Sequence, residues 1–522
     1  MALDSNRAER QHTYGQDCIF LGSASTAGGE DVPDELPAEV RVLVVGAGCG
    51  GLAVAAHLRA AGYRSAGDLL IIEKADEVGG TWRDNTYPEC ACDVQSVLYS
   101  FSFAPNPDWP NSYGRQPDIL RYLIRTTRES GLIDHIRFGC ELVDAVWDGT
   151  HWVATTSQGT VRAQVLVAAT GALSAPRLPD LPGIGTFAGQ AFHSARWDHS
   201  VPLAGRRVGV VGTGASAVQF VPAIAPEVGR LTVFQRTPGW VLPRGDRPYV
   251  AGERALYRRW PITQKISRGT TYVYRESMVV GMAHVPRALP AFQLVAETHL
   301  KRQVRDPELR EKLRPPFQIG CKRALLSDDW FPALQRPNVE LVTAAAAEVT
   351  PTGVVDATGR GHDLDVLIFG TGFTPTEPPV ARLLTGSAGR SLAETWDGSP
   401  RAHLGITVHG FPNLFLMYGP NTNLGHSSII YMLESQARYV VDAVRTLDRG
   451  RLASVEVRAE VESAGADAMQ RQLAHSVWNT GGCASWYLDR NGRNSVMWPT
   501  FTWRYRQRTR RFDLDSYHLK AV

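Results

Sequence analysis

Two short apolar runs, each followed by glycines and then by small apolar residues at helical spacing, stand out along the chain. The first is RVLVVGAGCGGLAVAAHLRAAG at residues 41–62, and the second is RRVGVVGTGASAVQFVPAIA at residues 206–225. Near-continuous apolar runs are typical of strands in a parallel sheet that is buried on both faces. Each run therefore predicts a buried strand, a tight glycine turn and a helix.

The spacing of the small residues in both turns suits a bound dinucleotide. The first turn fits GxGxxG through Gly46, Gly48 and Gly51, and the second has Gly212, Gly214 and Ala217. Such residues permit the tight turn, let the backbone approach a pyrophosphate and let the helix pack on the strand, while the helix N-terminus offers free N–H groups. Two dinucleotide sites are predicted, with an ordinary glycine-rich turn as the alternative.

The residues that end the next strand of each unit carry opposite chemistry. The strand in DLLIIEK ends at Glu73, whose carboxylate accepts hydrogen bonds from ribose hydroxyls and disfavours a 2′-phosphate, so this site suits FAD or NAD. The strand in LTVFQRTP ends at Gln235 and Arg236. A guanidinium binds a 2′-phosphate in a bidentate fork, which favours NADPH over NADH. The alternative for Arg236 is a solvated surface charge.

Two such units predict an α/β fold with two Rossmann-like dinucleotide-binding domains, one for FAD and one for NADPH, placed so that hydride passes between the cofactors. The turns in VLVAATGALSAP and DVLIFGTGF suit chain crossings, so the FAD domain is expected to be split. Residues 243–320 mix aromatic and charged residues at helical spacing and predict a helical insert in the NADPH domain. The predicted boundaries are a tail at 1–37, the FAD domain at 38–175 and 359–522 (with a C-terminal lid region), the NADPH domain at 176–242 and 321–358, and the insert at 243–320.

The run FTWRYRQRTRRF near the C-terminus predicts a half-exposed strand with Trp503 and Tyr505 on one face. A nucleic-acid patch is the alternative.

Composition narrows the possible partners and the location. A net charge of +3, from 55 basic and 52 acidic residues, gives no reason to expect nucleic acid or a membrane surface. The charged N-terminus lacks a secretory signal, and the longest early apolar run is shorter than the ~20 residues that span a bilayer, so no stable membrane insertion is expected. Seven scattered cysteines without CxxC spacing predict reduced thiols in the cytoplasm and no zinc site.

The connector between the two units, FAGQAFHSARWD, carries large residues where linkers are usually small and polar. It resembles the FxGxxxHxxxW[P/D] signature of Baeyer–Villiger monooxygenases, a class B flavoprotein monooxygenase family. A second stretch resembles that family's GGxWxxxxYPxxxxD signature. The matching residues of the linker are Phe187, Gly189, His193, Trp197 and Asp198, and those of the second signature are Gly79, Gly80, Trp82, Tyr87, Pro88 and Asp93.

The resemblance implies FAD, NADPH, O2 and a ketone, with oxygen inserted beside the carbonyl through a C4a-peroxyflavin to give an ester or lactone. It implies that Arg323 is the catalytic arginine and that Asp93 supports it. Lys322 would bind a phosphate, and the linker would couple domain motion to catalysis as a hinge. Trp486 would belong to a lid over the nicotinamide. Cofactor contacts are also expected from Gly80, Thr81, Trp82, Tyr99 and Asn421.

Three alternative functions fit these residues less well. A class B oxygenase acting on sulfur or nitrogen would not need the arginine and usually has Tyr or Phe at the position of Trp197. A disulfide reductase would need a close cysteine pair, and only Cys90 and Cys92 are near each other. A non-enzymatic NADPH-binding scaffold would be expected to have lost the glycine turns and the Arg–Asp pair. For His426, a capping or packing role is favoured over a catalytic one.

Overall fold

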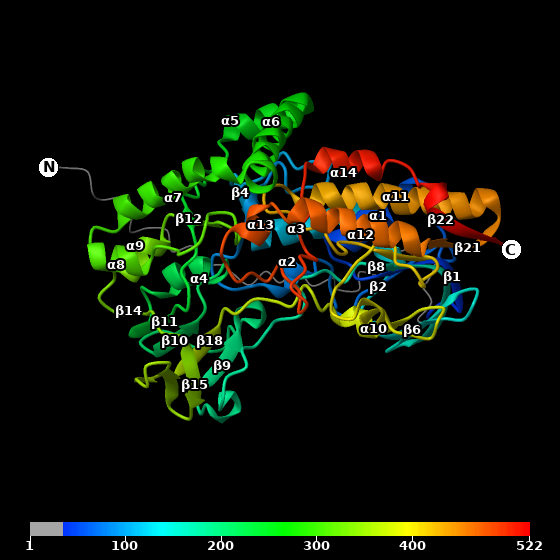
Figure 1. The fold of residues 1–522 in the computed structure, drawn as a ribbon. Helices are drawn as coiled ribbons and strands as arrows, with labels where there is room; N and C mark the ends of the chain where they lie inside the picture. The colour runs from blue at the N-terminus through cyan, green and yellow to red at the C-terminus, as the bar shows by residue number, and fades with distance from the viewer. Residues whose placement is uncertain (1–34) are drawn as a thin grey trace, which may run out of the picture. The chain divides into compact units, whose positions relative to one another are not determined.

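The first apolar run forms a central strand of an eight-stranded sheet (Figure 1). The structure is a computed structural model that describes residues 35–522, so the predicted tail lies outside the described residues except for its last three. The order along the sheet is β19-β6-β7-β8-β1-β2-β5, and β20 also pairs with β8. The strands are β1 (Glu39–Val45), β2 (Leu69–Ile72), β5 (Ile136–Arg137), β6 (Leu142–Trp147), β7 (Trp152–Thr156), β8 (Gly159–Ala168), β19 (Leu384–Thr385) and β20 (Leu414–Leu416).

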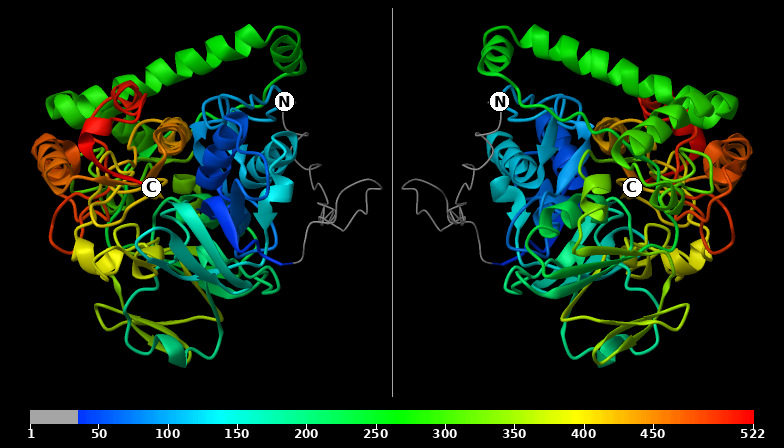
Figure 2. Two further views of the ribbon diagram at one scale, coloured as in Figure 1. Left: turned by 90° about the vertical axis from the view of Figure 1, so that its right-hand side faces the viewer. Right: turned by 90° about the vertical axis from the view of Figure 1, so that its left-hand side faces the viewer.

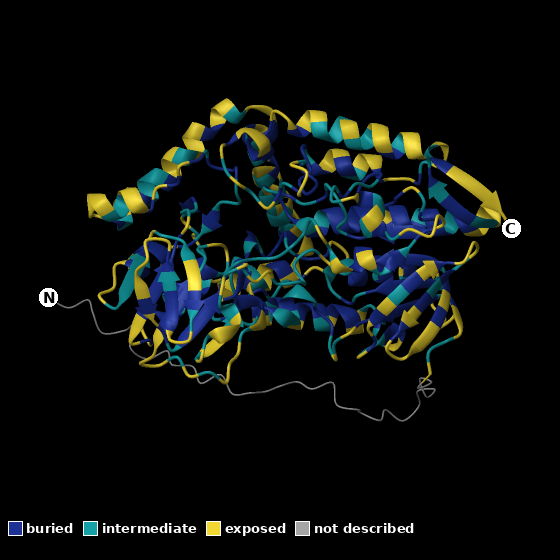
Figure 3. Cartoon of the chain, turned by 60° about the horizontal axis from the view of Figure 1, so that its bottom comes forward, coloured by how far each residue is buried: buried dark blue, intermediate teal, exposed yellow. Residues whose placement is uncertain are grey.

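Strand β1 is buried on both faces, as its apolar sequence predicts. Val42 and Val44 join one core cluster, while Leu43 and Val45 join another on the opposite face. The first cluster also takes residues from α1 (Cys49–Ala60), α3 (Gln116–Glu129) and α11 (Ile429–Gly450). Figure 3 shows the central strands buried and the outer faces of the helices exposed. Strands β19 and β20 come from after residue 380, so the chain returns to the first sheet late in the sequence.

The second apolar run forms β10 (Arg207–Val211), in the middle of a five-stranded parallel sheet. The order is β14-β11-β10-β18-β9. Helices α4 (Ala217–Ile224) and α9 (Trp330–Leu334) pack together beside it. The other strands are β9 (Gln190–His193), β11 (Arg230–Phe234), β14 (Val339–Val342) and β18 (Val366–Phe369), and an antiparallel sheet of β15 (Ala346–Thr350), β16 (Gly353–Asp356) and β17 (Gly361–Asp363) follows β14. The predicted fold class, with two Rossmann-like units, is confirmed.

The predicted insert is helical. It lies between β12 (Val241–Leu242) and β13 (Leu325–Leu326), which pair in parallel and close the insert at its base. Its helices are α5 (Ala251–Arg259), α6 (Pro261–Val279), which continues as one π-helical turn (η4, Val280–His284), α7 (Leu289–Gln303) and α8 (Pro307–Lys312). Within residues 35–522, no single helix has the length and apolar composition to cross a membrane, whereas the bent pair Pro261–His284 and Pro286–Gln303 meets that test jointly, with 114° between its halves.

The strand prediction at the C-terminus is wrong, because residues Thr502–Arg508 form α14. Thr502, Tyr505 and Thr509 are buried at helical spacing, whereas Trp503 is exposed. Glu276 on α6 fixes the start of this helix by accepting hydrogen bonds from the N–H and hydroxyl of Thr502, both at 2.8 Å. The remaining elements of this region are β21 (Leu452–Val457), α12 (Ala459–Leu473), α13 (Val477–Thr480) and β22 (Tyr517–Ala521).

Candidate active site

The first glycine turn is shaped by close backbone contacts that only glycine permits. Gly46 has φ of 104°, and a Cβ at Gly51 would lie 1.8 Å from the carbonyl oxygen of Gly46. A Cβ at Gly48 would meet Gly80 at 3.7 Å, so the second signature packs directly on the first turn. The turn leads into α1, whose N-cap Gly48 carries no capping side chain. The N–H groups of this helix start are therefore available to a pyrophosphate, which is the fit that FAD requires.

Glu73 stands at the end of β2, where the sequence places it. Its Oε2 accepts the N–H of Ala47 at 2.8 Å, and its Oε1 accepts the N–H of Ala75 at 3.1 Å and contacts Arg83 Nη1 at 3.0 Å. These contacts hold the carboxylate beside the glycine turn. A carboxylate oxygen has two lone pairs, so Oε2 keeps acceptor capacity for a ribose hydroxyl.

The second signature builds the side of the same site. Gly80 has φ of 52° and begins α2 (Thr81–Asp84). Trp82 donates its indole N–H to the hydroxyl of Tyr99 at 3.0 Å and meets that ring edge to face. Trp82 is buried, so these two predicted cofactor residues form one rigid wall next to the glycine turn.

At the second turn, two cations lie close enough for their charges to interact. Arg236 follows β11 and is exposed, and Gln235 is buried and donates to the carbonyl of Lys312 at 2.8 Å. Burial and the nearby charge of Arg236 lower the pKa of Lys322. A Cβ at Gly214 would meet no atom within 4 Å, so the backbone is open to a ligand there. An open glycine turn beside two mutually repelling cations fits the pyrophosphate and 2′-phosphate of NADPH.

The linker packs as core and supplies the edge strand of the second sheet. Trp197 contacts Phe192 and Phe220, each at 5.2 Å between ring centroids, and Phe187 packs in the core around Phe234. A Cβ at Gly189 would lie 2.4 Å from the carbonyl oxygen of Asp365. These contacts agree with the packing interpretation, and the hinge role of the linker stays a prediction.

The polar side chains of the linker are held by local hydrogen bonds. His193 Nδ1 accepts the N–H of Ala195 at 3.0 Å, and Asp198 Oδ1 accepts the N–H and hydroxyl of Ser200 at 2.9 and 2.6 Å. Burial and the charge of Arg196 lower the pKa of His193 to about 4. The imidazole is therefore neutral at pH 7.

Arg323 and Asp93 meet across 230 residues of sequence. The guanidinium of Arg323 donates two hydrogen bonds to the carboxylate of Asp93, from Nε to Oδ2 and from Nη2 to Oδ1, the latter at 2.7 Å. Nη1 donates to the carbonyl of Leu424 at 3.1 Å. Both side chains are half-buried, with 29–30% of their surface accessible.

The charges of this pair stabilise each other. Burial alone raises the pKa of Asp93, but the charge and hydrogen bonds of Arg323, with the charge of Arg275, outweigh burial and hold it below its ordinary value. Burial lowers the pKa of Arg323, and Asp93 outweighs that effect and raises it. Both groups are therefore ionised at neutral pH.

Residues that sequence reasoning missed surround the pair. Arg275 on α6 donates to the backbone carbonyl of Asp93 and to the side chain of Gln95, both at 2.8 Å. The hydroxyl of Tyr418 donates to Asn423 at 2.7 Å, and the charge of Arg323 acts on the pKa of both Tyr418 and Tyr487. No motif marks these residues, because each lies on an element that only the fold brings to Asp93.

The expectation that all cysteines are reduced is wrong, because Cys321 and Cys483 form a disulfide. Their sequence separation of 162 residues hides the pair, and the fold brings the segment before Lys322 against the loop that holds Trp486. Trp486 is 40% exposed and packs on Tyr487, so its lid role stays a prediction, as does a cytoplasmic location. Cys90 and Cys92 are buried free thiols.

The start of α11 has unpaired buried polar groups. The hydroxyls of Ser427 and Ser428 have no hydrogen-bond partner, and Ser428 is the N-cap. Asn421 instead donates its amide to the carbonyls of Asn494 and Met497 at 2.8 and 3.1 Å, which holds the C-terminal loop. His426 is buried with Nε2 3.3 Å from Glu276, neither ring nitrogen has a hydrogen-bond partner among the described residues, and its capping or packing role stays a prediction. Free hydroxyls at a helix N-terminus fit the polar edge of a flavin.

Comparisons with known proteins show the family to which the chain belongs. A profile of the flavin-binding monooxygenase-like family matches residues 39–268. A relative named Baeyer–Villiger monooxygenase from Streptomyces coelicolor is 47% identical over 93% of this chain and 94% of its own.

Solved structures of the same kind superpose over most of the chain. Cyclohexanone monooxygenase from Rhodococcus sp. Phi1 bound to NADP+ has a TM-score of 0.81 at 29% identity, covering 93% of this chain and 100% of its own. The complex of OTEMO with FAD and NADP has a TM-score of 0.82 at 26% identity, covering 92% and 99%.

Proposed function

Because the chain belongs to the Baeyer–Villiger monooxygenases, which use FAD and NADPH, we propose that Arg323 stabilises the negative charge that develops during oxygen insertion beside a ketone carbonyl. The observation that carries this proposal is the pair of hydrogen bonds that Arg323 donates to the carboxylate of Asp93. Asp93 sets the plane of the guanidinium and balances its charge, so the cation stands ready before substrate arrives.

The hydrogen-bond inventory of Arg323 leaves room for a ligand. Three of its N–H groups donate to Asp93 and to the carbonyl of Leu424. A guanidinium has five N–H donors, so two remain, one on each terminal nitrogen. We assign these two to oxyanion stabilisation at the substrate carbonyl. When bound, FAD reduced by NADPH would activate O2, one atom of which enters the ester while the other leaves as water.

A hydrogen bond from α6 to the main chain of Asp93 supports the proposed role of this pair. Arg275 holds the main chain of Asp93 while Arg323 holds its side chain. Asp93 therefore acts as a positioning residue whose carboxylate cannot turn away from Arg323. Arg236 and Lys322 are proposed to hold the 2′-phosphate of NADPH, and the loop with Trp486 to cover the nicotinamide and exclude water.

The test is product analysis with a panel of ketones and sulfides, using the wild type, Arg323→Ala, Arg323→Lys and Asp93→Asn. We expect Arg323→Ala to lower the rate of ester formation about 10²–10³-fold, as loss of an oxyanion donor does. Arg323→Lys is expected to recover little, because an ammonium lacks the bidentate geometry. FAD content and NADPH oxidation, measured separately, show whether the variants keep their cofactors.

Two results would contradict the proposal. Ester formation that survives Arg323→Ala would remove the role of the arginine. A wild type that oxidises sulfides and forms no ester from any ketone would favour the heteroatom-oxidising class.

A further inference from the structure

Before its buried last residue, Val279, helix α6 exposes several apolar side chains and turns polar ones inward. A surface helix normally buries its apolar stripe and exposes charge. In α6, the exposed side chains include Ile262, Ile266 and Val273, at 61%, 62% and 66% of their surface. At about 100° per residue these three lie within about 40° of one another on the helix. The pattern is therefore the reverse of that of a helix folded onto its own core.

The inner side of α6 is held to the molecule by polar contacts. Gln264 donates to the carbonyl of Asn106 at 2.6 Å, and Arg268 donates to the carbonyls of Val97 and Ser100 at 2.9 and 2.8 Å. Further along, Arg275 binds the segment around Asp93, and Glu276 binds Thr502. These contacts fix which side of α6 faces inward, so the outward position of the apolar side chains is built into the fold.

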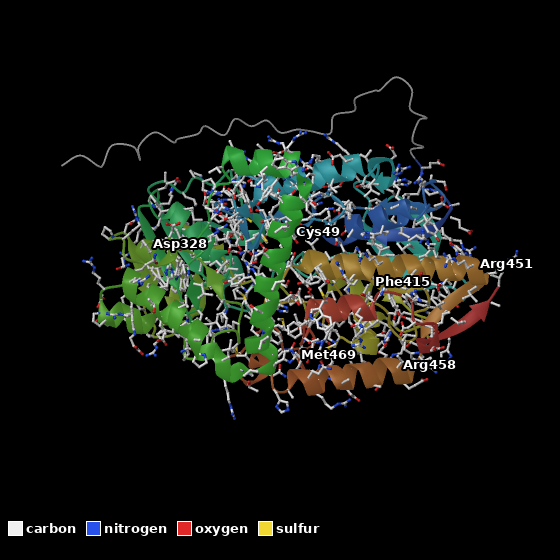
Figure 4. All side chains as sticks on the ribbon, turned by 90° about the horizontal axis from the view of Figure 1, so that it is seen from above. Cys49, Asp328, Phe415, Arg451, Arg458 and Met469 are labelled. Atoms are coloured by element: carbon white, nitrogen blue, oxygen red, sulfur yellow. A yellow bond between two sulfur atoms is a disulfide. The ribbon has the colours of Figure 1, made fainter. Side chains whose placement is uncertain are left out.

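The apolar surface extends beyond the three central residues. We define the α6 outer face as Trp260, Ile262, Ile266, Val273, Tyr274 and Val280, all exposed. More than half of the large apolar side chains exposed within residues 35–522 belong to residues 250–295. Helix α6 crosses the molecule as the uppermost helix in the view from above (Figure 4). In the side views of Figure 2 it runs along the top edge. Several large exposed apolar side chains on one helix and its ends are typical of an interaction surface.

The exposed charged side chains of the segment that carries the patch are all basic, and one of them, Arg258, pairs with Asp108. The exposed charged residues between 250 and 303 are Arg258, Arg259, Lys265, Arg287, Lys301 and Arg302. The acidic residues of this segment are withdrawn from the surface: Glu276 is buried, and Glu253 and Glu297 pair with Arg247 and Arg314. The neighbouring α14 adds an exposed Trp503 and further exposed arginines. The partner of this face must therefore be apolar within and anionic at its edge.

We propose that the α6 outer face docks on the surface of an anionic phospholipid bilayer. Apolar side chains would enter the boundary between headgroups and acyl chains, with Trp260 and Tyr274 at its level and the cations against lipid phosphates. A second copy of the chain fits less well, because a two-fold contact would place the same cations against each other. The inference concerns an attachment surface and does not depend on the chemistry at Arg323.

The experiment is flotation of the FAD-loaded full chain with two kinds of vesicle. One kind is phosphatidylcholine alone, and the other is equal parts phosphatidylcholine and phosphatidylglycerol. We expect binding to the mixed vesicles, little binding to phosphatidylcholine, and weakening as salt is added, because the lipid charge is screened. Binding to neither vesicle would overturn the proposal.

Two sets of variants locate the surface. Ile266→Glu with Val273→Glu is expected to weaken vesicle binding by more than about tenfold, whereas Val143→Glu with Leu519→Glu, at exposed apolar positions on β6 and β22, should leave it unchanged. Lys265→Gln is expected to weaken binding about fivefold and to leave the apolar face intact. FAD content shows that each variant is folded.

Light scattering on the same protein variants without vesicles tests the alternative partner, a second copy of the chain. A wild type that is dimeric in solution and that becomes monomeric in Ile266→Glu with Val273→Glu, without vesicle binding, would assign the face to a second copy. Equal vesicle binding by the wild type and this double variant would also overturn the proposal, because the α6 outer face would then play no part.

Discussion

The two glycine turns share one architecture but differ in charge and in whether the third small residue can carry a side chain. The first carries a buried carboxylate, Glu73, in contact with Arg83, and the second carries an exposed Arg236 beside Lys322. The third small residue is Gly51 in the first turn, where a Cβ would collide with Gly46, and Ala217 in the second, where a side chain is already buried. The fold therefore repeats the same glycine turn, and we propose that the residue at the end of the following strand selects the cofactor.

The largest expected effect comes from giving the first turn a side chain. Gly51→Val places carbon atoms inside the contact with the Gly46 carbonyl, so α1 must move away from β1. We expect protein purified without FAD, measured by the ratio of flavin to protein absorbance. Ala217→Gly at the matching position of the second turn should cost only about 0.5–1 kcal/mol of stability. Normal FAD loading in Gly51→Val would contradict the close-packing argument.

The cofactor preference of the second turn is expected to change when its cations are removed. Arg236→Gln with Lys322→Gln should lower kcat/KM for NADPH by more than about a hundredfold and change that for NADH little, because each of the two lost charged hydrogen bonds costs about 1.5–3 kcal/mol. Arg230→Gln, at the other end of β11 and paired with Glu340, is the matched control. Equal losses with both nucleotides would mean that the two cations do not bind the 2′-phosphate.

A smaller effect, on the pH dependence of the free energy of unfolding, is expected from His193, which is buried and neutral in the linker between the turns. Its pKa of about 4 lies below the 6.5 of the unfolded chain, so between these values the unfolded chain binds a proton that the folded chain does not. The free energy of unfolding therefore falls as the pH falls from 6.5 towards 4, by about 1–2 kcal/mol between pH 7 and pH 5. Urea unfolding of the wild type and His193→Gln checks this. An equal pH dependence in both would show that His193 does not contribute.

Local patterns predicted the parts of the site that local physics builds. The strand, glycine turn and helix of each unit follow from side-chain volume and backbone freedom over about 20 residues, and Glu73 and Arg236 are placed by the strands that precede them. The strand prediction at residues 501–512 failed. The alternation of residues did not determine the local structure, whereas the packing of Tyr505 against Trp498 did. Glu276, more than 200 residues earlier in the chain, also holds the start of that helix.

The sequence by itself determined two nucleotide-binding units, the opposite charges that distinguish them, and, through family resemblance, the identities of Arg323 and Asp93. The tertiary structure alone decided the two-point contact between those residues, the support from Arg275, the Cys321–Cys483 bond and the outward apolar face of α6. The physical reason is the distance along the sequence over which each feature is determined. Turns and strand ends are set by neighbouring residues. Contacts between distant segments depend on how whole elements pack, and no local pattern records that packing.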